Sequence, residues 1–179
     1  MIMTEMGEFL VGAWLKVVQK CDFIQYNDRL PGGGLKGLAE VDVIGLNLTS
    51  KEAYLCEVTT HLRGLGYVDY PTTMEKLKTK FESDKKYADE MLKAFPTRHY
   101  MFWSPVVPEG KLITLLDELK KELQRRLNLD LELVINRQYA ERVEQLKNEA
   151  HDKNEDTGNP AFRLLQILGH LKQESRVSL

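Results

Sequence analysis

Cysteine and histidine are scarce in this sequence. Cys21 and Cys56 are the only cysteines among its 179 residues, and the four histidines lie along the chain without a His-x-x-x-His spacing. Two distant cysteines are too few for a disulfide framework or a cysteine-rich zinc site, and the histidines lack the spacing of zinc ligands. We therefore expect two buried thiols and no zinc site.

Long hydrophobic runs and an excess of charge are also absent. No apolar stretch approaches the roughly 20 residues of a membrane-spanning helix. The first residues carry Glu5, Glu8 and Lys16 among the apolar positions, unlike a secretory signal. We expect a cytoplasmic protein with no membrane contact. Because the net charge is only -2, binding of nucleic acid would need a local basic patch.

Two common catalytic and nucleotide-binding motifs are missing, and a third is misplaced. The chain has no Gly-x-Ser-x-Gly and no phosphate-binding P-loop. Residues 32–37 read GGGLKG, which satisfies G-x-G-x-x-G, but they lead into a predicted strand. The dinucleotide fingerprint follows a strand and opens a helix, so we expect a flexible loop here instead of a cofactor site.

The spacing of apolar residues predicts ten elements in the order αβββαβαβαα. The length favours one domain over 1–179, and this order is typical of an α/β fold whose mixed sheet begins as an antiparallel meander. The last helix is apolar on more than one face, so it is either buried in its own domain or the contact of a homodimer. Helices are predicted over 4–20, 72–95, 111–127, 138–150 and 160–172, and strands over 22–27, 40–46, 53–59, 98–103 and 131–135.

Two predicted neighbouring strands each carry an acidic residue, Asp42 in the first and Glu57 in the second. Side chains alternate between the faces of a strand, and a hairpin turn centred on Thr49 and Ser50 would place Asp42 opposite Glu57. The same register would place Glu40 and Thr59 opposite each other. The sequence therefore predicts that two carboxylates meet on one face of the sheet.

Such a pair needs compensation, because facing carboxylates repel each other and lose solvation when buried. A shared proton, a salt bridge from lysine or arginine, or a divalent cation would each supply it. A further alternative is that Asp42 and Glu57 are merely ion-paired on a solvent-exposed sheet edge. The residues alone leave these alternatives open.

Three segments resemble the PD-(D/E)XK nuclease superfamily, particularly its Holliday-junction-resolvase-like and restriction-endonuclease-like branches: GEFLVGAWLKVVQKCDFIQYN, AEVDVIG and YLCEVTTH. In that family a helix carries Glu, a strand carries Asp, and the strand after a hairpin carries Glu-x-Lys. Glu8, Asp42 and Glu57 match these three acidic positions. The resemblance covers about residues 5–103. It implies a restriction-endonuclease-like core over about 5–135 and a C-terminal helical extension over about 136–173.

The sequence departs from the family at Thr59, where the pattern expects lysine. In the family that lysine orients or activates the attacking water and helps to neutralise the charge of the phosphorane, whereas threonine offers only a neutral hydroxyl. The helix predicted over 72–95 could supply a substitute, and we expect Lys80 by its place relative to the family helix. The alternative is that this residue and its neighbours form a solvated face: Lys76, Lys78, Lys85 and Lys86.

The resemblance implies a cation site for Mg²⁺ or Mn²⁺ made of Asp42, Glu57 and the backbone carbonyl of Val58, an oxygen-rich set that hard cations favour. Glu8 would join it through water or a second ion. The activity implied is hydrolysis of phosphodiester bonds in DNA by a metal-activated water. Four further residues are candidates for contacts with the nucleic-acid backbone: Arg29, Lys36, His61 and Arg63.

Two functional hypotheses follow from the resemblance. The first is a metal-dependent endonuclease that acts on DNA. The second is a catalytically weakened protein of the same fold that serves as a nucleic-acid-binding or protein-interaction module. Many nucleases of this fold work as dimers, so the homodimer through the C-terminal helix stays an alternative to its burial.

Overall fold

The computed structural model describes residues 4–31, 40–61 and 69–177, with side chains up to residue 171. This part of the chain has five helices and five strands in the predicted order, so the α/β prediction is confirmed. The helices are α1 (Met6–Val17), α2 (Tyr70–Met91), α3 (Lys111–Leu127), α4 (Arg137–Asp152) and α5 (Pro160–Val177), and the strands are β1 (Phe23–Arg29), β2 (Glu40–Asn47), β3 (Glu52–Val58), β4 (Thr97–Ser104) and β5 (Leu131–Ile135).

The five strands form one mixed sheet in the order β1-β2-β3-β4-β5. The first three strands pair antiparallel, and β4 and β5 then add in parallel to β3. Val43 pairs with Cys56 and Ile44 with Leu55, which is the register predicted for the β2–β3 hairpin. As a result, β3 lies in the centre of the sheet, with Glu57 near its end.

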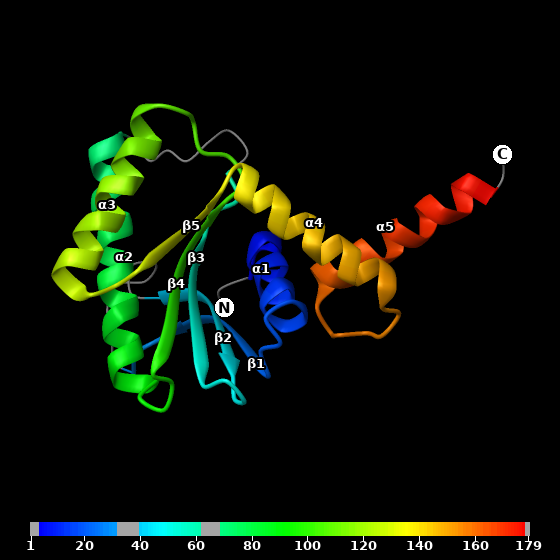
Figure 1. Cartoon of the computed structure of the whole chain (residues 1–179), viewed down its shortest axis with the longest axis horizontal. Coiled ribbons are helices and arrows are strands. Elements are labelled where there is room, and N and C mark those ends of the chain that lie inside the picture. Colours follow the sequence, from blue (N-terminus) through cyan, green and yellow to red (C-terminus); the bar gives the residue numbers. More distant parts are fainter. Residues whose placement is uncertain (1–3, 32–39, 62–68, 178–179) are drawn as a thin grey trace.

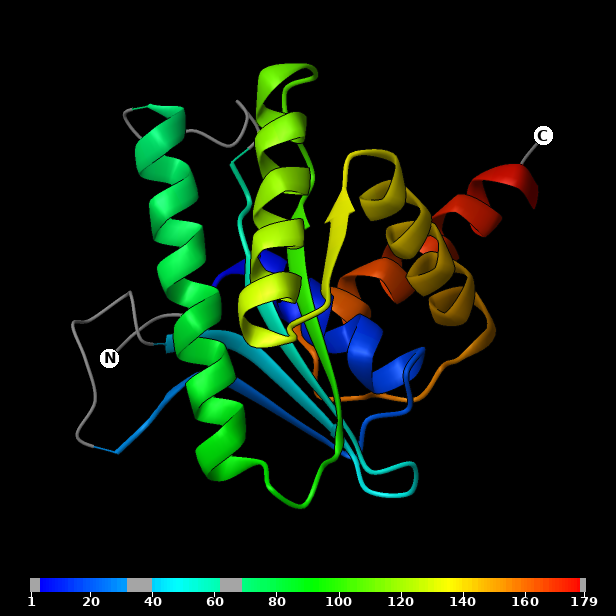
Figure 2. The same cartoon turned by 60° about the vertical axis from the view of Figure 1, so that its left-hand side comes forward.

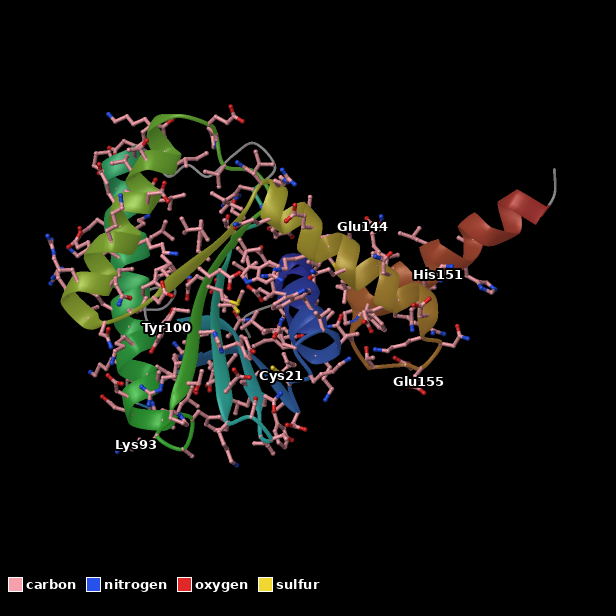
Figure 3. The ribbon with its side chains drawn as sticks, in the orientation of Figure 1. Cys21, Lys93, Tyr100, Glu144, His151 and Glu155 are labelled. Carbon is pink, nitrogen blue, oxygen red and sulfur yellow. The ribbon has the colours of Figure 1, made fainter. Side chains whose placement is uncertain are left out.

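Helices cover both faces of the sheet. α2 and α3 lie on one face, and α1, α4 and α5 lie on the other (Figures 1 and 2). The core between the sheet and the helices α2 and α3 contains Leu55 and Phe102 of the sheet, and Figure 3 labels Tyr100 on this side. On the α1 side, Trp14 and Trp103 pack edge to face with ring centroids 5.2 Å apart. The sheet is thus buried on both faces.

Long-range and capping contacts set the ends of α2, and the predicted ends differ from the observed ones. α2 begins at Tyr70 because the Asp69 side chain accepts a hydrogen bond from Thr72 N at 2.7 Å. The helix ends at Met91, before the predicted residue 95: Leu92 leaves the helical conformation, and its N–H donates a hydrogen bond to the carbonyl of Ala88. Arg98 then donates hydrogen bonds to the carbonyls of Leu92 and Phe95.

The helix α1 packs closely against β1 because it carries a glycine at the contact. A Cβ atom on Gly12 would lie 2.1 Å from the hydroxyl oxygen of Tyr26, so no larger residue fits without a shift. The Tyr26 hydroxyl in turn accepts a hydrogen bond from Asn159 Nδ2 at 3.1 Å. This approach brings Glu8, one turn earlier, to the sheet. None of the described helices combines the length and hydropathy needed to cross a bilayer.

Candidate active site

Asp42 lies where the β2–β3 ladder ends. Val43 and Cys56 form the last pair of the ladder, and beyond it Asp42 Oδ2 accepts a hydrogen bond from the backbone N–H of Val58 at 2.8 Å. The Asp42 side chain therefore takes the place of a strand carbonyl and is held in one orientation. The carbonyl of Val58 points to the same side of β3 as its N–H, because both groups of one residue face the same neighbouring strand.

Lys80 of α2 reaches between Asp42 and Glu57. Its Nζ lies 3.1 Å from Oδ1 and 3.3 Å from Oδ2 of Asp42, and it forms a close ion pair with Oε2 of Glu57. Leu77 and Phe81, on either side of Lys80 in the sequence, are buried in the core and fix the helix above the strands. The expected approach of Lys80 to the two carboxylates is thus present in the structure.

The ion pair shows how the sheet tolerates two facing carboxylates. Glu57 is only 1% exposed and β3 is the central strand, so the alternative of a solvent-exposed sheet edge is wrong. Burial lowers the pKa of Lys80, but the charges of Glu57 and Asp42 outweigh it and raise the pKa above its ordinary value. The ammonium therefore stays charged and compensates both acids.

Asp84 is a third acid of the site that the sequence analysis missed. It lies one helical turn after Lys80 and is 1% exposed. Its carboxyl group is in hydrogen-bonding contact with that of Glu57, and two carboxyl groups bond in this way only when one carries a proton. Its spacing from Leu77, Phe81 and Ala88 could have revealed it, because an acid on the apolar face of a helix is unusual.

The acids of this cluster compete for positive charge. Burial raises the pKa of Glu57 well above its ordinary value, Asp42 and Asp84 add to this, and Lys80 opposes it. Burial likewise raises the pKa of Asp84, which lies farther from solvent than Asp42. Because the pKa values of both Glu57 and Asp84 are raised and their carboxyl groups lie in contact, we assign one proton to the Glu57–Asp84 pair. Oε1 of Glu57 and Oδ2 of Asp84 accept no hydrogen bond from a donor in the described residues.

Glu8 lies near the cluster, but its contacts belong to the start of α1. Its Oε2 accepts hydrogen bonds from the backbone N–H of Glu5 at 3.1 Å and from Asn27 Nδ2 at 3.0 Å. The first contact is half of a capping box. Burial raises the pKa of Glu8, and the charge of Asp42 contributes to the rise. Glu8 is thus close enough to Asp42 to interact with it electrostatically.

Thr59 follows the last residue of β3, and its backbone N–H donates to the carbonyl of Trp103 at 2.9 Å. Its hydroxyl is buried and has no hydrogen-bond partner among the described residues. The position that carries lysine in the family pattern therefore provides no charge here. The positive charge comes from Lys80 on the neighbouring helix instead.

The candidate DNA-contact residues are only partly described. Arg29 ends β1 opposite Glu40 of β2, and His61 follows β3, so both lie near the same ends of the strands as Asp42 and Glu57. Both side chains are exposed. Lys36 and Arg63 lie outside the described residues.

The donor set of the cluster suits a hard cation. Asp42, Glu57 and the Val58 carbonyl offer only oxygen atoms, as Mg²⁺ and Mn²⁺ prefer. Glu57 Oε1 is a buried acceptor that still lacks a donor. Within the described ranges, no three Asp, Glu, His or Cys side chains lie close enough together to hold one metal ion. The residues therefore fit a cation with two carboxylate ligands, at the point where the Lys80 ammonium now lies.

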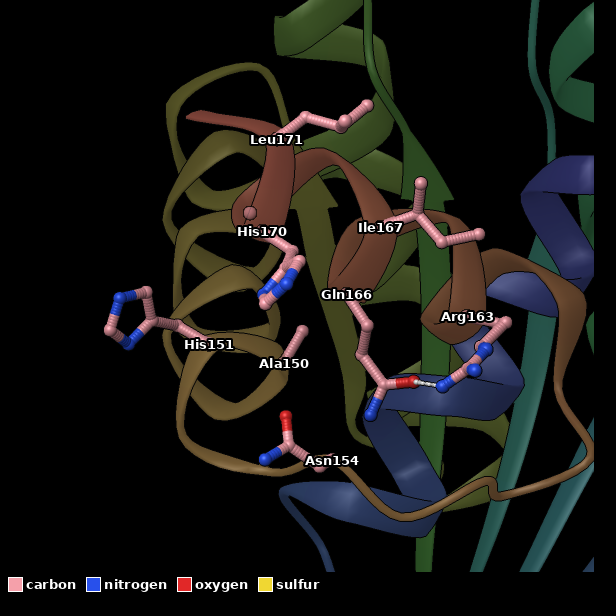
Figure 4. A pocket seen from close by; sticks show the side chains of 9 residues that line it. Ala150, His151, Asn154, Arg163, Gln166, Ile167, His170 and Leu171 are labelled. Atoms are coloured by element: carbon pink, nitrogen blue, oxygen red, sulfur yellow. Dashed lines mark hydrogen bonds between the residues drawn. The ribbon is translucent and has the colours of Figure 1, made fainter. Parts of the chain in front are cut away.

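A separate hollow of about 490 Å³ lies between the end of α4 and α5 (Figure 4). Gln166 in its wall accepts a hydrogen bond from Arg163 and donates to the backbone carbonyls of Lys153 and Glu155. These contacts hold the α4–α5 connection in place. Asp42, Glu57 and Lys80 do not line this hollow.

No protein family model, no curated protein and no solved structure matches this chain. Its function has to be inferred from the geometry of the acids and Lys80.

The proton of the Glu57–Asp84 pair predicts an unusual pH dependence of stability. The raised pKa means that the folded chain keeps a proton that the unfolded chain releases above about pH 4. Wild-type stability should therefore fall as the pH rises from that value towards the folded-state pKa. In Asp84→Asn the amide can donate to Glu57 without a titrating proton. The free energy of unfolding of the variant, relative to that of wild type, should therefore increase between about pH 5 and pH 8.

Urea unfolding at several pH values measures this difference. The matched control is Asp89→Asn on the same helix, because a hydrogen bond from Lys85 lowers the pKa of Asp89. The control should show no such gain. Parallel stability profiles for wild type and Asp84→Asn would contradict the assigned proton.

Proposed function

We propose that this chain is a metal-dependent endonuclease that hydrolyses phosphodiester bonds in DNA, built on a restriction-endonuclease-like core. The observation that carries the proposal is the position of Lys80 between Asp42 and Glu57. The order of helices and strands, and a helix glutamate beside the sheet, also agree with the PD-(D/E)XK pattern.

The proposed cation is Mg²⁺ or Mn²⁺. Asp42, Glu57 and the carbonyl of Val58 would hold it, with Glu8 nearby to interact through water. When bound, such an ion polarises a phosphodiester and lowers the pKa of a water molecule for in-line attack. Asp42 is well suited to this role because the Val58 N–H fixes its carboxylate and part of its side chain remains exposed.

Lys80 takes the role of the motif lysine in this proposal. Its pKa is raised by Glu57 and Asp42 against the effect of burial, so it acts as a fixed positive charge and not as a proton acceptor. A buried ammonium beside the scissile phosphate stabilises the negative charge that develops in the transition state. The exposed residues Arg29 and His61 lie near the same ends of the strands as the two carboxylates. They are proposed to contact the DNA backbone, together with Lys36 and Arg63.

A catalytically weakened nucleic-acid-binding or protein-interaction module is the second candidate. The observation that favours it is that Lys80 already pairs with the two carboxylates to which a cation would bind. A homodimer is a further proposal, because α5 exposes several apolar side chains that a second copy could cover: Leu164, Ile167, Leu168 and Leu171. The mass of the protein in solution decides that point.

The nuclease proposal predicts metal-dependent cleavage that requires Lys80. Linear, nicked, single-stranded and branched DNA would be incubated with Mg²⁺, Mn²⁺ or chelator, and initial rates compared among variants. We expect Lys80→Ala and Asp42→Asn to lose about a hundredfold or more in rate, because each removes a charge at the reacting group. Lys86→Ala is the matched control, since Lys86 is an exposed lysine of the same helix.

The control should cleave at the wild-type rate. Cleavage that persists with chelator, or that Asp42→Asn leaves unchanged, would contradict the proposed site. Binding of DNA without any cleavage would favour the second candidate.

The lysine should also work from its usual position on the strand. Thr59 is two residues after Glu57, where the family pattern places lysine. We therefore expect the double variant Thr59→Lys/Lys80→Ala to cleave at least about tenfold faster than Lys80→Ala. The double variant Thr59→Met/Lys80→Ala is the control, because methionine has similar length without charge. Equal rates for the two double variants, with intact circular dichroism spectra, would show that Lys80 does not replace the strand lysine.

A further inference from the structure

The Lys80 ammonium lies where a cation would have to bind. It contacts both oxygens of Asp42 and Oε2 of Glu57, so a divalent ion held by these two carboxylates must displace it. Two positive groups cannot share that point, because their repulsion in a poorly solvated site is large. Lys80 therefore needs a second position if it is to stay near the cation.

Exposure indicates the direction of this displacement. The Asp42 and Lys80 side chains are 13% and 16% exposed, so a cation can enter from their side. Glu57 and Asp84 are each 1% exposed and lie deeper. When a cation enters at Asp42, the ammonium can move in one of two directions. It moves outward into solvent, or inward along Glu57 towards Asp84.

Asp84 provides what the inward position requires. Residues four apart in a helix are neighbours on its surface, so Asp84 is within reach of the flexible Lys80 side chain. Oε1 of Glu57 and Oδ2 of Asp84 are buried acceptors without a donor among the described residues. An ammonium has three N–H donors and could serve both oxygens. An outward movement would instead leave both acceptors unsatisfied, which is costly for buried groups.

We propose that Asp84 is the second binding position of the Lys80 ammonium, occupied when a divalent cation binds Asp42 and Glu57. This inference rests on the proposed function, because it presupposes a cation site. Asp84 is then a positioning residue that keeps Lys80 beside the cation and the reacting phosphate. The proton that Glu57 and Asp84 share leaves to solvent as the ammonium arrives. Three ionised carboxylates, one ammonium and one divalent ion then sum to zero charge, which favours a buried cluster.

Isothermal titration of the full chain with Mn²⁺ tests the inference through a double-mutant cycle of Asp84→Asn and Lys80→Met. With Lys80 present, we expect Asp84→Asn to raise the Kd for Mn²⁺ about tenfold or more, because the displaced ammonium loses its partner. With Lys80→Met in place, no ammonium has to move, and Asp84→Asn should change the Kd less than about twofold. Asp89→Asn is the control for removal of an acid from α2.

The outcomes separate the alternatives. An equal loss of affinity in both backgrounds would show that Asp84 acts on the cation directly. An unchanged Kd with Lys80 present would show that Asp84 takes no part. Either result overturns the inference and leaves the proposed function standing. Wild-type protein that binds no Mn²⁺ would overturn the proposed function itself, and the inference with it.

A second measurement serves if Lys80→Met does not fold. In protein loaded with Mg²⁺, a buried and hydrogen-bonded ammonium exchanges its protons slowly, so the ¹⁵N–¹H signal of Lys80 Nζ should remain visible by NMR. It should disappear in Asp84→Asn loaded with Mg²⁺. Loss of the signal in loaded wild-type protein would mean that the ammonium moves outward, which contradicts the inference.

Discussion

The site depends on the ion pairs that join Lys80 to Asp42 and Glu57. The hairpin of β2 and β3 brings two carboxylates together near the end of the central strand of a sheet that is buried on both faces. Neither strand offers a positive charge there. The compensation has to come from another element. It comes from α2, whose buried residues Leu77 and Phe81 pack in the core and fix the position of Lys80 over the strands. Packing of the core thus determines the electrostatics of the site.

The order of the elements and the β2–β3 register were predictable from the sequence, because alternation along a strand and the position of the turn fix which residues face each other. Lys80 could be chosen only through the family pattern, since its approach depends on how α2 packs. Asp84 was missed although its position on the apolar face of α2, between Phe81 and Ala88, is a signal that the sequence does carry. The ends of α2 were misplaced because capping by Asp69 and binding by Arg98 decide them.

A lysine on a helix differs physically from a lysine on the strand at Thr59. From α2, Lys80 meets both carboxylates and has Asp84 one turn away, so its ammonium has more than one acid to pair with. A strand lysine at Thr59 would lack that neighbour on its own element. In the proposed nuclease, the charge of Lys80 would thus be coupled to a buried acid that the short family motif does not contain, and the proposed chemistry would depend on the packing of α2.

Anomalous X-ray diffraction from crystals soaked in Mn²⁺ tests the central claim most directly, because it locates the cation without depending on any substrate. An anomalous peak in contact with the carboxylates of Asp42 and Glu57 is the expected result, with the Lys80 ammonium displaced from the point between them. No peak at these carboxylates at a high concentration of Mn²⁺, with Lys80 still bridging them, would contradict the assignment of this cluster as a nuclease site.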